Sequence, residues 1–258
     1  ISNGEQAIAI GEDSTANGIG SIAIGGNNDA DGDGVPDQGQ GATTDGADAI
    51  AMGAGASATG PSTTSIGGEA VTNGPGSTAI GWQSAATAER AQAFGHLATA
   101  QGVRSLAIGE NADAQSDLST AIGNEAIANG TDALAIGDTA SATGPSTTSV
   151  GGESVTNGPG STAVGWQSAA TAERAQAFGH LATAQGERSL AVGENADAQS
   201  DLSTAIGNEA IANGTDALAI GDTSVATGPS TTAVGGESVA NGPGTTALGW
   251  QANAAAPF

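Results

Sequence analysis

The sequence predicts an all-β fold: a parallel β-roll, or β-solenoid, built from short coils that repeat with a period of 14. Three observations lead to this fold class. A glycine recurs at every fourteenth position from Gly53 to Gly249, and Gly11 and Gly25 keep the same register. The residue before each of these glycines is a large hydrophobe, and small residues alternate with large ones on either side. A period this short indicates one small supersecondary unit per repeat, stacked on its neighbours.

We number each coil from this glycine, which is position zero. Positions −3, −2 and −1 read large, small, large, as in Leu106-Ala107-Ile108, which is the side-chain period of a strand. A second alternation follows, with small residues at +3 and +5, as at Ala112 and Ala114. Position +7 is usually glycine again, which ends the second strand. Each coil is therefore predicted to hold two short strands and two tight turns, with parallel neighbours about 4.8 Å above and below.

The small residues predict which side of each strand faces inward. Alanine at −2, +3 and +5 fits between the two strands only if the coil is very thin. The residue at −1 then points out of its own coil and creates an outward row of 17 Ile, Val, Leu, Met and Phe side chains. Such a row favours association, so we expect several identical rolls packed row to row around a common axis. The alternative is that the row fills the inside of a wider single-chain β-helix.

Composition agrees with a repeat built on alanine. Hydrophobic residues make up 38% of the 258 residues, but aromatic residues only 2%, which is too few for a conventional core. The net charge is −23, with 27 acidic residues against four arginines and no lysine. This balance excludes nucleic acid as a partner, because phosphates need a basic face. No stretch is long and apolar enough to span a membrane, and no signal peptide is visible; a surface protein with neither is expected to be a fragment.

One segment interrupts the repeat and is a candidate calcium loop. Residues 29–37 read D-x-D-x-D-G-x-x-D, the first nine positions of an EF-hand-like loop, in which alternating oxygens converge on a hard cation. The candidate ligands are Asp29, Asp31, Asp33, the carbonyl of Val35, and Asp37. Position twelve is Gln40 rather than a bidentate glutamate, so the loop is closer to the Asp-rich loops of thrombospondin type 3 repeats. The alternative is an acidic, glycine-rich loop without an ion.

This interruption divides the chain into three parts. Residues 1–26 are predicted as β-roll coils, residues 27–47 as the Asp/Gly-rich insertion, and residues 48–258 as further coils. A longer repeat runs over the last part, because residues 59–102 recur at 143–186 with three changes, an offset of six coils. Nearly identical copies suggest a duplication that lengthened the stack.

Position +1, directly after each zero glycine, is the most varied part of the coil. Stacking is expected to bring Trp82 to about 5 Å from His96, and Trp166 equally near His180. We interpret these rings first as packing that shields the coil edge or caps a groove between chains, and second as a binding site. Catalysis is not expected, because no acid–base pair in a shaped pocket accompanies either histidine.

The repeat resembles the head repeat of the trimeric autotransporter adhesins, the YadA-like head family. The motif is Ser-x-Ala-Ile-Gly followed by x-x-Ala-x-Ala-x-Gly, and it is clearest at residues 21–25, 105–109, 119–123 and 203–207. The resemblance covers residues 1–26 and about 48–258. It implies a left-handed roll assembled as an intertwined or side-by-side homotrimer, carried on a stalk outside a Gram-negative bacterium. The Asp-rich insertion departs from the usual head pattern, and no adhesive residues are transferred.

The resemblance implies a trimeric cell-surface adhesin head, not an enzyme, that attaches a bacterium to surfaces, matrix proteins, glycans or other cells. Anchoring in the outer membrane would come from regions outside this chain. The only cofactor expected is calcium, and no nucleic-acid or membrane contact is expected. Two alternatives stay open: a β-solenoid that binds ice or another crystal surface, and a tip module of an appendage or phage fibre. Threonine does occur repeatedly at −3, but Ile, Leu and Gln interrupt the rank.

Overall fold

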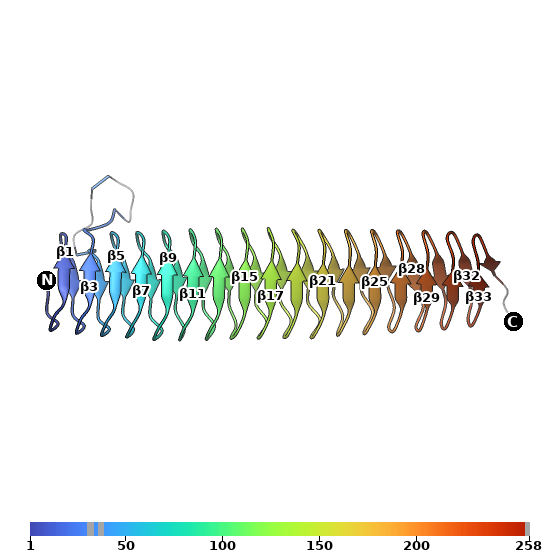
Figure 1. Cartoon of the computed structure of the whole chain (residues 1–258), viewed down its shortest axis with the longest axis horizontal. Helices are drawn as coiled ribbons and strands as arrows, with labels where there is room; N and C mark the ends of the chain where they lie inside the picture. The colour runs from blue at the N-terminus through green and yellow to red at the C-terminus, as the bar shows by residue number, and fades with distance from the viewer. Residues whose placement is uncertain (30–33, 36–38, 256–258) are drawn as a thin grey trace. The chain divides into compact units, whose positions relative to one another are not determined.

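The computed structural model describes residues 1–29, 34–35 and 39–255, which form strands and turns and contain no helix. The chain divides into two compact units, Ile1–Asn129 and Gly130–Phe258. Each unit is a stack of coils with two short strands per coil (Figure 1). The predicted parallel β-solenoid is therefore confirmed.

In the first unit, one parallel sheet contains the three-residue strands and a second contains the two-residue strands. The first sheet consists of β1 (Ile8–Ile10), β3 (Ile22–Ile24), β5 (Ile50–Met52), β7 (Thr64–Ile66), β9 (Thr78–Ile80), β11 (Gln92–Phe94), β13 (Leu106–Ile108) and β15 (Thr120–Ile122). The second consists of β2 (Thr15–Ala16), β4 (Thr43–Thr44), β6 (Ser57–Ala58), β8 (Val71–Thr72), β10 (Ala85–Ala86), β12 (Thr99–Ala100), β14 (Asp113–Ala114) and β16 (Ile127–Ala128).

The second unit has the same two sheets, except that β28, β30 and β32 of its second sheet are three residues long. Its first sheet consists of β17 (Leu134–Ile136), β19 (Thr148–Val150), β21 (Thr162–Val164), β23 (Gln176–Phe178), β25 (Leu190–Val192), β27 (Thr204–Ile206), β29 (Leu218–Ile220), β31 (Thr232–Val234) and β33 (Thr246–Leu248). Its second sheet consists of β18 (Ser141–Ala142), β20 (Val155–Thr156), β22 (Ala169–Ala170), β24 (Thr183–Ala184), β26 (Asp197–Ala198), β28 (Ile211–Asn213), β30 (Val225–Thr227), β32 (Val239–Asn241) and β34 (Asn253–Ala254).

Strand register follows the sequence period. In the first unit Ala93 pairs with Ala107 and Thr99 with Asp113, each pair one full period apart. In the second unit Ala177 pairs with Ala191 in the same way. Equivalent positions of successive coils therefore stack on one another, and each coil completes the backbone hydrogen bonds of the coil before it.

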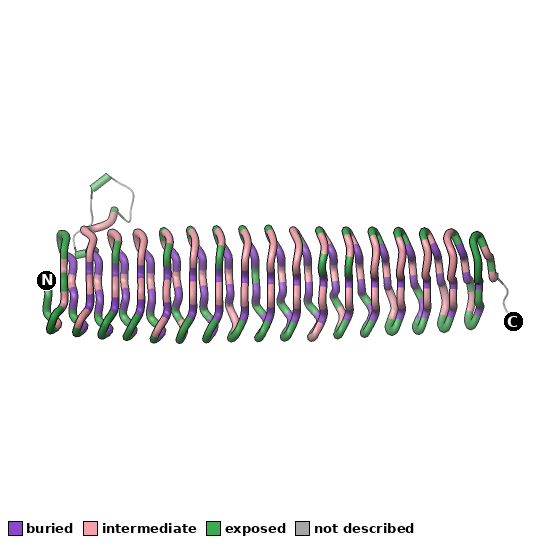
Figure 2. Tube along the Cα trace, viewed as in Figure 1, coloured by how far each residue is buried: buried purple, intermediate pink, exposed green. Residues whose placement is uncertain are grey.

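The core of each coil contains only small side chains. Alanine, serine and threonine fill positions −4, −2, +3 and +5, and threonine is the largest side chain that is fully buried. Figure 2 shows the resulting alternation of buried with partly or fully exposed residues along the tube. The predicted thin coil is confirmed, with position −4 as a further inward site. The wider β-helix is excluded for the described coils, because no residue at −1 is buried in them.

Both turns of a coil require left-handed backbone. The first turn runs from position zero to +3, and its residue at +2 is left-handed, as at Leu97 (φ 57°). The second turn, from +7 to +10, has a left-handed residue at +9, as at Arg90 (φ 55°). These positions are mostly not glycine, so the stacked hydrogen bonds hold them in a conformation that costs each residue about 1–2 kcal/mol.

The coil resumes earlier than the boundary predicted at residue 48. Strand β4 (Thr43–Thr44) pairs with β2 and β6, so residues 42–47 belong to a regular coil and not to the insertion. The insertion lies in the first turn of its coil, between β3 and β4, and projects from the stack (Figure 1). The boundary was placed too late because the composition of residues 38–47 is typical of a loop. These residues include part of a regular coil, whose inward residues Ala42 and Thr44 are fully buried.

Candidate adhesive surface

An outward apolar row runs along the first sheet of each unit. It consists of the residues at −1, and its side chains alternate with buried alanine or serine at −2. In the first unit Ile10 is 56% exposed, Ile80 39% and Ile108 38%, whereas the alanine next to each of the last two is completely buried. In the second unit Phe178 is 37% exposed and Leu248 is 74% exposed. Each coil therefore presents a large hydrophobe that its own chain does not cover.

The outward side of the second sheet is more polar. Its side chains at +4 are mixed, and those at +6 are mainly Asn, Thr and Gln. Both positions hydrogen-bond from coil to coil: at +4 Thr99 Oγ1 donates to Asp113 Oδ1 at 2.6 Å, and at +6 Thr143 Oγ1 donates to Asn157 Oδ1 at 2.8 Å. In the second unit a shallow depression of about 440 Å³ lies on this side, lined by Asn195, Asp197, Glu209, Ile211, Thr223 and Val225. The two sides of the roll thus differ in their chemistry.

Asp13 fastens the base of the insertion to the coil beneath it. Its Oδ2 accepts hydrogen bonds from the Gly39 N–H at 2.8 Å and from Asn27 Nδ2 at 2.9 Å. The Gln40 N–H donates in turn to Asn27 Oδ1 at 3.1 Å. The Gly39 bond, and then the Asn27 bond, hold the pKa of the exposed Asp13 carboxyl below its ordinary value. One carboxylate therefore binds both ends of the insertion.

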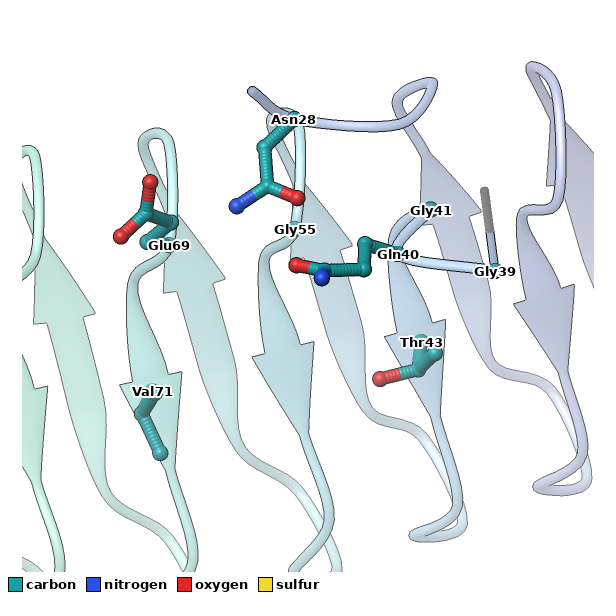
Figure 3. Close-up of a pocket in the computed structure, with 8 residues that line it drawn as sticks. All are labelled: Asn28, Gly39, Gln40, Gly41, Thr43, Gly55, Glu69 and Val71. Carbon is teal, nitrogen blue, oxygen red and sulfur yellow. The ribbon is translucent and has the colours of Figure 1, made fainter. Parts of the chain in front are cut away.

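A depression of about 440 Å³ lies where the insertion meets the coils, lined by Asn28, Gly39, Gln40, Gly41, Thr43, Gly55, Glu69 and Val71. Figure 3 shows the amides of Asn28 and Gln40 on the side of the insertion and the Glu69 carboxylate on a neighbouring turn. Asn28 Oδ1 is buried and has no hydrogen-bond partner among the described residues. The lining is polar, but Glu69 brings it a single carboxylate, which does not make a metal site.

Of the candidate calcium ligands, only Asp29 and Val35 belong to the described residues, while Asp31, Asp33 and Asp37 lie outside them. Asp29 Oδ2 accepts a hydrogen bond from the Gly34 N–H at 2.8 Å. Within the described residues, no three His, Cys, Asp or Glu side chains gather as a metal site would require. Calcium binding at this loop therefore stays a prediction from the sequence.

Exposed rings stack in the first turns of both units. The ring centroids of Trp82 and His96 are 5.0 Å apart with planes inclined by 13°, which is the spacing expected from the sequence. His96 Nδ1 lies 3.4 Å from Glu110 Oε1. Trp166 and His180 in the second unit have the same centroid distance and angle. The indoles are 47% and 46% exposed, so these stacks shield part of the turn edge and leave nearly half of each ring open to solvent.

The arginines occupy the other turn. Arg90, Arg104, Arg174 and Arg188 all stand at +9, in the second turn. Three of them lie near the glutamate that precedes them, at 3.8–3.9 Å. These three arginines are more than half exposed, so the ion pairs contribute little to stability. The described first turns, which carry the aromatic stacks, contain no basic residue other than the two histidines.

The chain matches the family described as YadA head domain repeat over residues 2–28, 38–56, 58–84, 86–112, 114–140, 142–168, 170–196, 198–224 and 226–254. From residue 58 onward the matches follow one another every two coils. The chain belongs to the YadA head repeat family. As a member of this family it is an adhesin head; heads of this family are exposed at the cell surface, and the family is of a non-enzymatic kind.

Among solved structures, a similar chain is the collagen-binding domain of the Yersinia adhesin YadA. The two are 27% identical, and the match covers 62% of this chain and 80% of the Yersinia chain, with a TM-score of 0.35. No curated protein matches the sequence. Among the described residues, no helix is long and apolar enough to cross a membrane.

Sequence reasoning missed two features of this surface. The contact of Asp13 with Gly39 and Asn27 gave no signal, because Asp13 is one of several acidic turn residues. The left-handed residues at +2 and +9 were also missed, since Glu, Gln, Leu and Arg do not indicate such backbone as Gly or Asn would. The regular place of these residues between a glycine and a buried small residue could have revealed them.

Proposed function

We propose that the chain acts as a homotrimeric adhesin head that attaches a bacterium to extracellular matrix protein. The observation that carries the proposal is the apolar row, which leaves one large hydrophobe per coil uncovered in both units. Burying one such side chain contributes roughly 1.5–3 kcal/mol, so three rolls that pack row to row gain stability with every coil. The turn edges and the polar side would then remain open to a ligand.

The trimer interface can be tested with two double variants of equal charge. Ile80→Asp with Ile108→Asp places two carboxylates on the apolar row, at sites that are 39% and 38% exposed. Val71→Asp with Ile127→Asp makes the same chemical change on the polar side, where Asp113 occurs naturally at an equivalent position. Sedimentation equilibrium should give a trimer for the wild type and the control, and dissociation or unfolding for the first pair. A folded, intact trimer of the Ile80 and Ile108 variant would exclude the row as interface.

Attachment is tested with purified ligands. The similar Yersinia chain is a collagen-binding domain, so collagen is the first probe, followed by other matrix proteins and glycans. We expect saturable binding of the trimer to an immobilised matrix protein and weaker binding of a dissociated variant. Equal, negligible binding to all of them would contradict the proposed target class while leaving the trimer intact.

Outer-membrane anchoring and calcium binding are further parts of this proposal. The family acts at the cell surface, and anchoring would come from segments other than this chain. Calcium would act on residues 27–41 alone, because the coils on both sides, including β4, pair without this segment.

A further inference from the structure

The side chains at +1 in the first turns form a row along the stack. In the coil before each tryptophan, position +1 is a glycine, which interrupts this row. A Cβ atom added at Gly152 would lie 3.1 Å from Trp166 Cδ1 and 3.8 Å from the backbone oxygen of Asp138. One added at Gly236 would lie 3.4 Å from Trp250 Cδ1 and 3.9 Å from the backbone oxygen of Asp222. In the second unit, therefore, an aspartate and an indole flank a position with no side chain.

We call these two places the Gly–Trp slots: Asp138–Gly152–Trp166 and Asp222–Gly236–Trp250. Parallel strands are about 4.8 Å apart, so the aspartate and the tryptophan, two coils apart, are separated by about 10 Å along the stack. Van der Waals contact takes about 3.5–4 Å on each side. The indole edge already lies within 3.1–3.4 Å of the Cβ position of each glycine, so one flat group can enter only outside the glycine backbone, parallel to the indole.

The ring that forms one wall is held in place and is partly open. His180 stacks on Trp166 with centroids 5.0 Å apart, and His180 Nδ1 lies 3.3 Å from Glu194 Oε1. The indole is therefore supported from the side away from Gly152. Trp166 is 46% exposed and Trp250 71% exposed, so solvent reaches both rings.

The charges around the slots favour a cation. In the sequence each glycine is followed by a glutamate. Glu153 accepts a hydrogen bond from Gln167 Nε2 at 2.6 Å, and Glu237 accepts one from Gln251 Nε2 at 2.8 Å. Asp222 accepts one from Asn208 Nδ2 at 2.9 Å. The arginines of the described second unit lie in the other turn, so no arginine lies beside these carboxylates. A cation above an indole face is attracted by the negative face of the ring, and carboxylates add to this attraction.

A flat cation that both stacks on a ring and pairs with a carboxylate is a guanidinium group. We propose that each Gly–Trp slot binds an arginine side chain of the partner protein, stacked on Trp166 or Trp250 and paired with Asp138 or Asp222. This inference rests on the proposed adhesive function and names the side chain that the head recognises. The first unit provides an internal comparison, because its corresponding site has Ala54 in place of the aspartate, before Gly68 and Trp82.

The test is a titration of the full chain with three short peptides that differ in one residue: arginine, lysine or citrulline. Citrulline is flat and neutral, whereas lysine is charged and not flat. Tryptophan fluorescence and NMR of the indole N–H groups report binding. We expect the arginine peptide to shift the Trp166 and Trp250 signals with at least threefold higher affinity than lysine, and the citrulline peptide to have little effect.

Two variants locate the binding. Gly152→Gln with Gly236→Gln fills both slots, and neither glycine has a left-handed backbone that a side chain would strain. It should abolish the response, while Gly68→Gln, the control in the copy without aspartate, should retain it. Asp138→Asn with Asp222→Asn should weaken arginine binding several-fold with little change in shape. Circular dichroism checks that each variant is folded.

Several outcomes would overturn the proposal: equal affinity for citrulline, equal affinity for lysine, an unchanged response after the slots are filled, or a response to neutral sugars alone. Matrix-protein binding is measured separately on the same variants. A head that binds matrix protein but shows no arginine preference would refute the slots and leave the proposed function standing. A head that binds the arginine peptide but no matrix protein would support the slots and refute the proposed matrix-protein target.

Discussion

Ala42 donates its backbone N–H to the carbonyl oxygen of Gly25 at 3.3 Å, the same bond that Ala56 gives to Gly53 at 3.2 Å in the next coil. In an ordinary coil two residues separate this donor from its acceptor. Here the insertion lies between them, and the turn still closes. Because β3 also pairs with β5 in register, as Ala23 with Ala51, the stack continues beneath the insertion. The backbone pairing of these coils therefore does not depend on the insertion.

The first prediction concerns Asp13, which holds both ends of this insertion. Asp13→Asn should loosen the insertion, because a neutral amide oxygen accepts weaker bonds from Gly39 and Asn27 than a carboxylate does. Asparagine also tolerates the left-handed backbone at this position (φ 55°), so the turn itself is not strained. Amide hydrogen exchange at Gly39 and Gln40 should rise, with exchange in β1–β3 unchanged. Glu12→Gln, which removes the neighbouring charge, is the control and should have no such effect.

The same contact should depend on pH. The Gly39 N–H and the Asn27 amide hold the pKa of Asp13 below its ordinary value of 3.8. The docked insertion thus favours the ionised carboxyl: its stabilisation is complete above pH 3.8 and is lost as the pH falls through the lowered value. Exchange at Gly39, corrected for intrinsic rates, should be constant at neutral and weakly acidic pH and should rise only below 3.8. The Asp13→Asn variant should show no such step, and an equal step in both would assign it to other carboxyls.

Calcium binding by residues 29–37 is the third prediction. Four aspartates within nine residues repel one another when ionised, and a cation at about 2.3–2.6 Å from their oxygens would remove this repulsion. Calorimetric titration should therefore give heat for the wild type and none for Asp31→Ala with Asp33→Ala. Chelation should increase proteolysis within residues 27–41 and leave the coils intact. If neither protein gives heat at millimolar calcium, the segment is an acidic loop without a calcium site.

The repeat made most of the fold predictable. A strict period of 14 fixes the register, and alanine at alternate positions fixes the inward side, as the pairing of Ala93 with Ala107 and their complete burial confirm. The same argument predicted the spacing of Trp82 and His96, because a stacked coil brings equal positions together.

The parts that the period does not govern were harder. The start of the coil at Ala42 was missed, because residues 38–47 contain three glycines and mimic a loop. The hydrogen bond from Gly39 to Asp13 joins residues 26 positions apart, one of them in an irregular segment, and no local sequence pattern predicts such a contact. The Gly–Trp slots depend on which turns stand two coils apart, so they emerge only when the side chains at +1 are considered as one row along the stack.

The zero glycines are required for stacking as well as for turning, which gives the fourth prediction. A Cβ atom on Gly109 would lie 2.3 Å from the carbonyl oxygen of Gly123, and Gly109 has a φ of +133°. Gly109→Ala should therefore destabilise its coil by on the order of 3 kcal/mol or more, measured by hydrogen exchange in β13 and β15. Gly68→Ala is the control, since its backbone is not left-handed and its Cβ would meet the exposed side chain of Trp82 at 3.0 Å and the Ala54 oxygen at 3.8 Å, an ordinary contact distance. Equal loss of protection in both variants would contradict a special role for the zero position.

The thin core gives the last prediction, at Ala121 of β15. This residue is completely buried between two strands, and no fully buried side chain in the described coils is larger than threonine. Ala121→Leu adds three carbon atoms to a space already closed on all sides, so its cost should reach or exceed the upper end of the range typical of overpacking, about 3 kcal/mol.

Ala121→Ser is the matched control. Serine occupies the same position at Ser65, where its Oγ donates to the Ala70 carbonyl at 2.7 Å, and Ala126 offers the equivalent carbonyl to a serine at 121. The serine variant should keep the exchange protection of β13 and β15, while the leucine variant should lose it locally and leave distant coils protected, because each coil depends chiefly on its neighbours. Equal protection in both variants would show that the coil can widen, and the alanine core would then not be what limits its thickness.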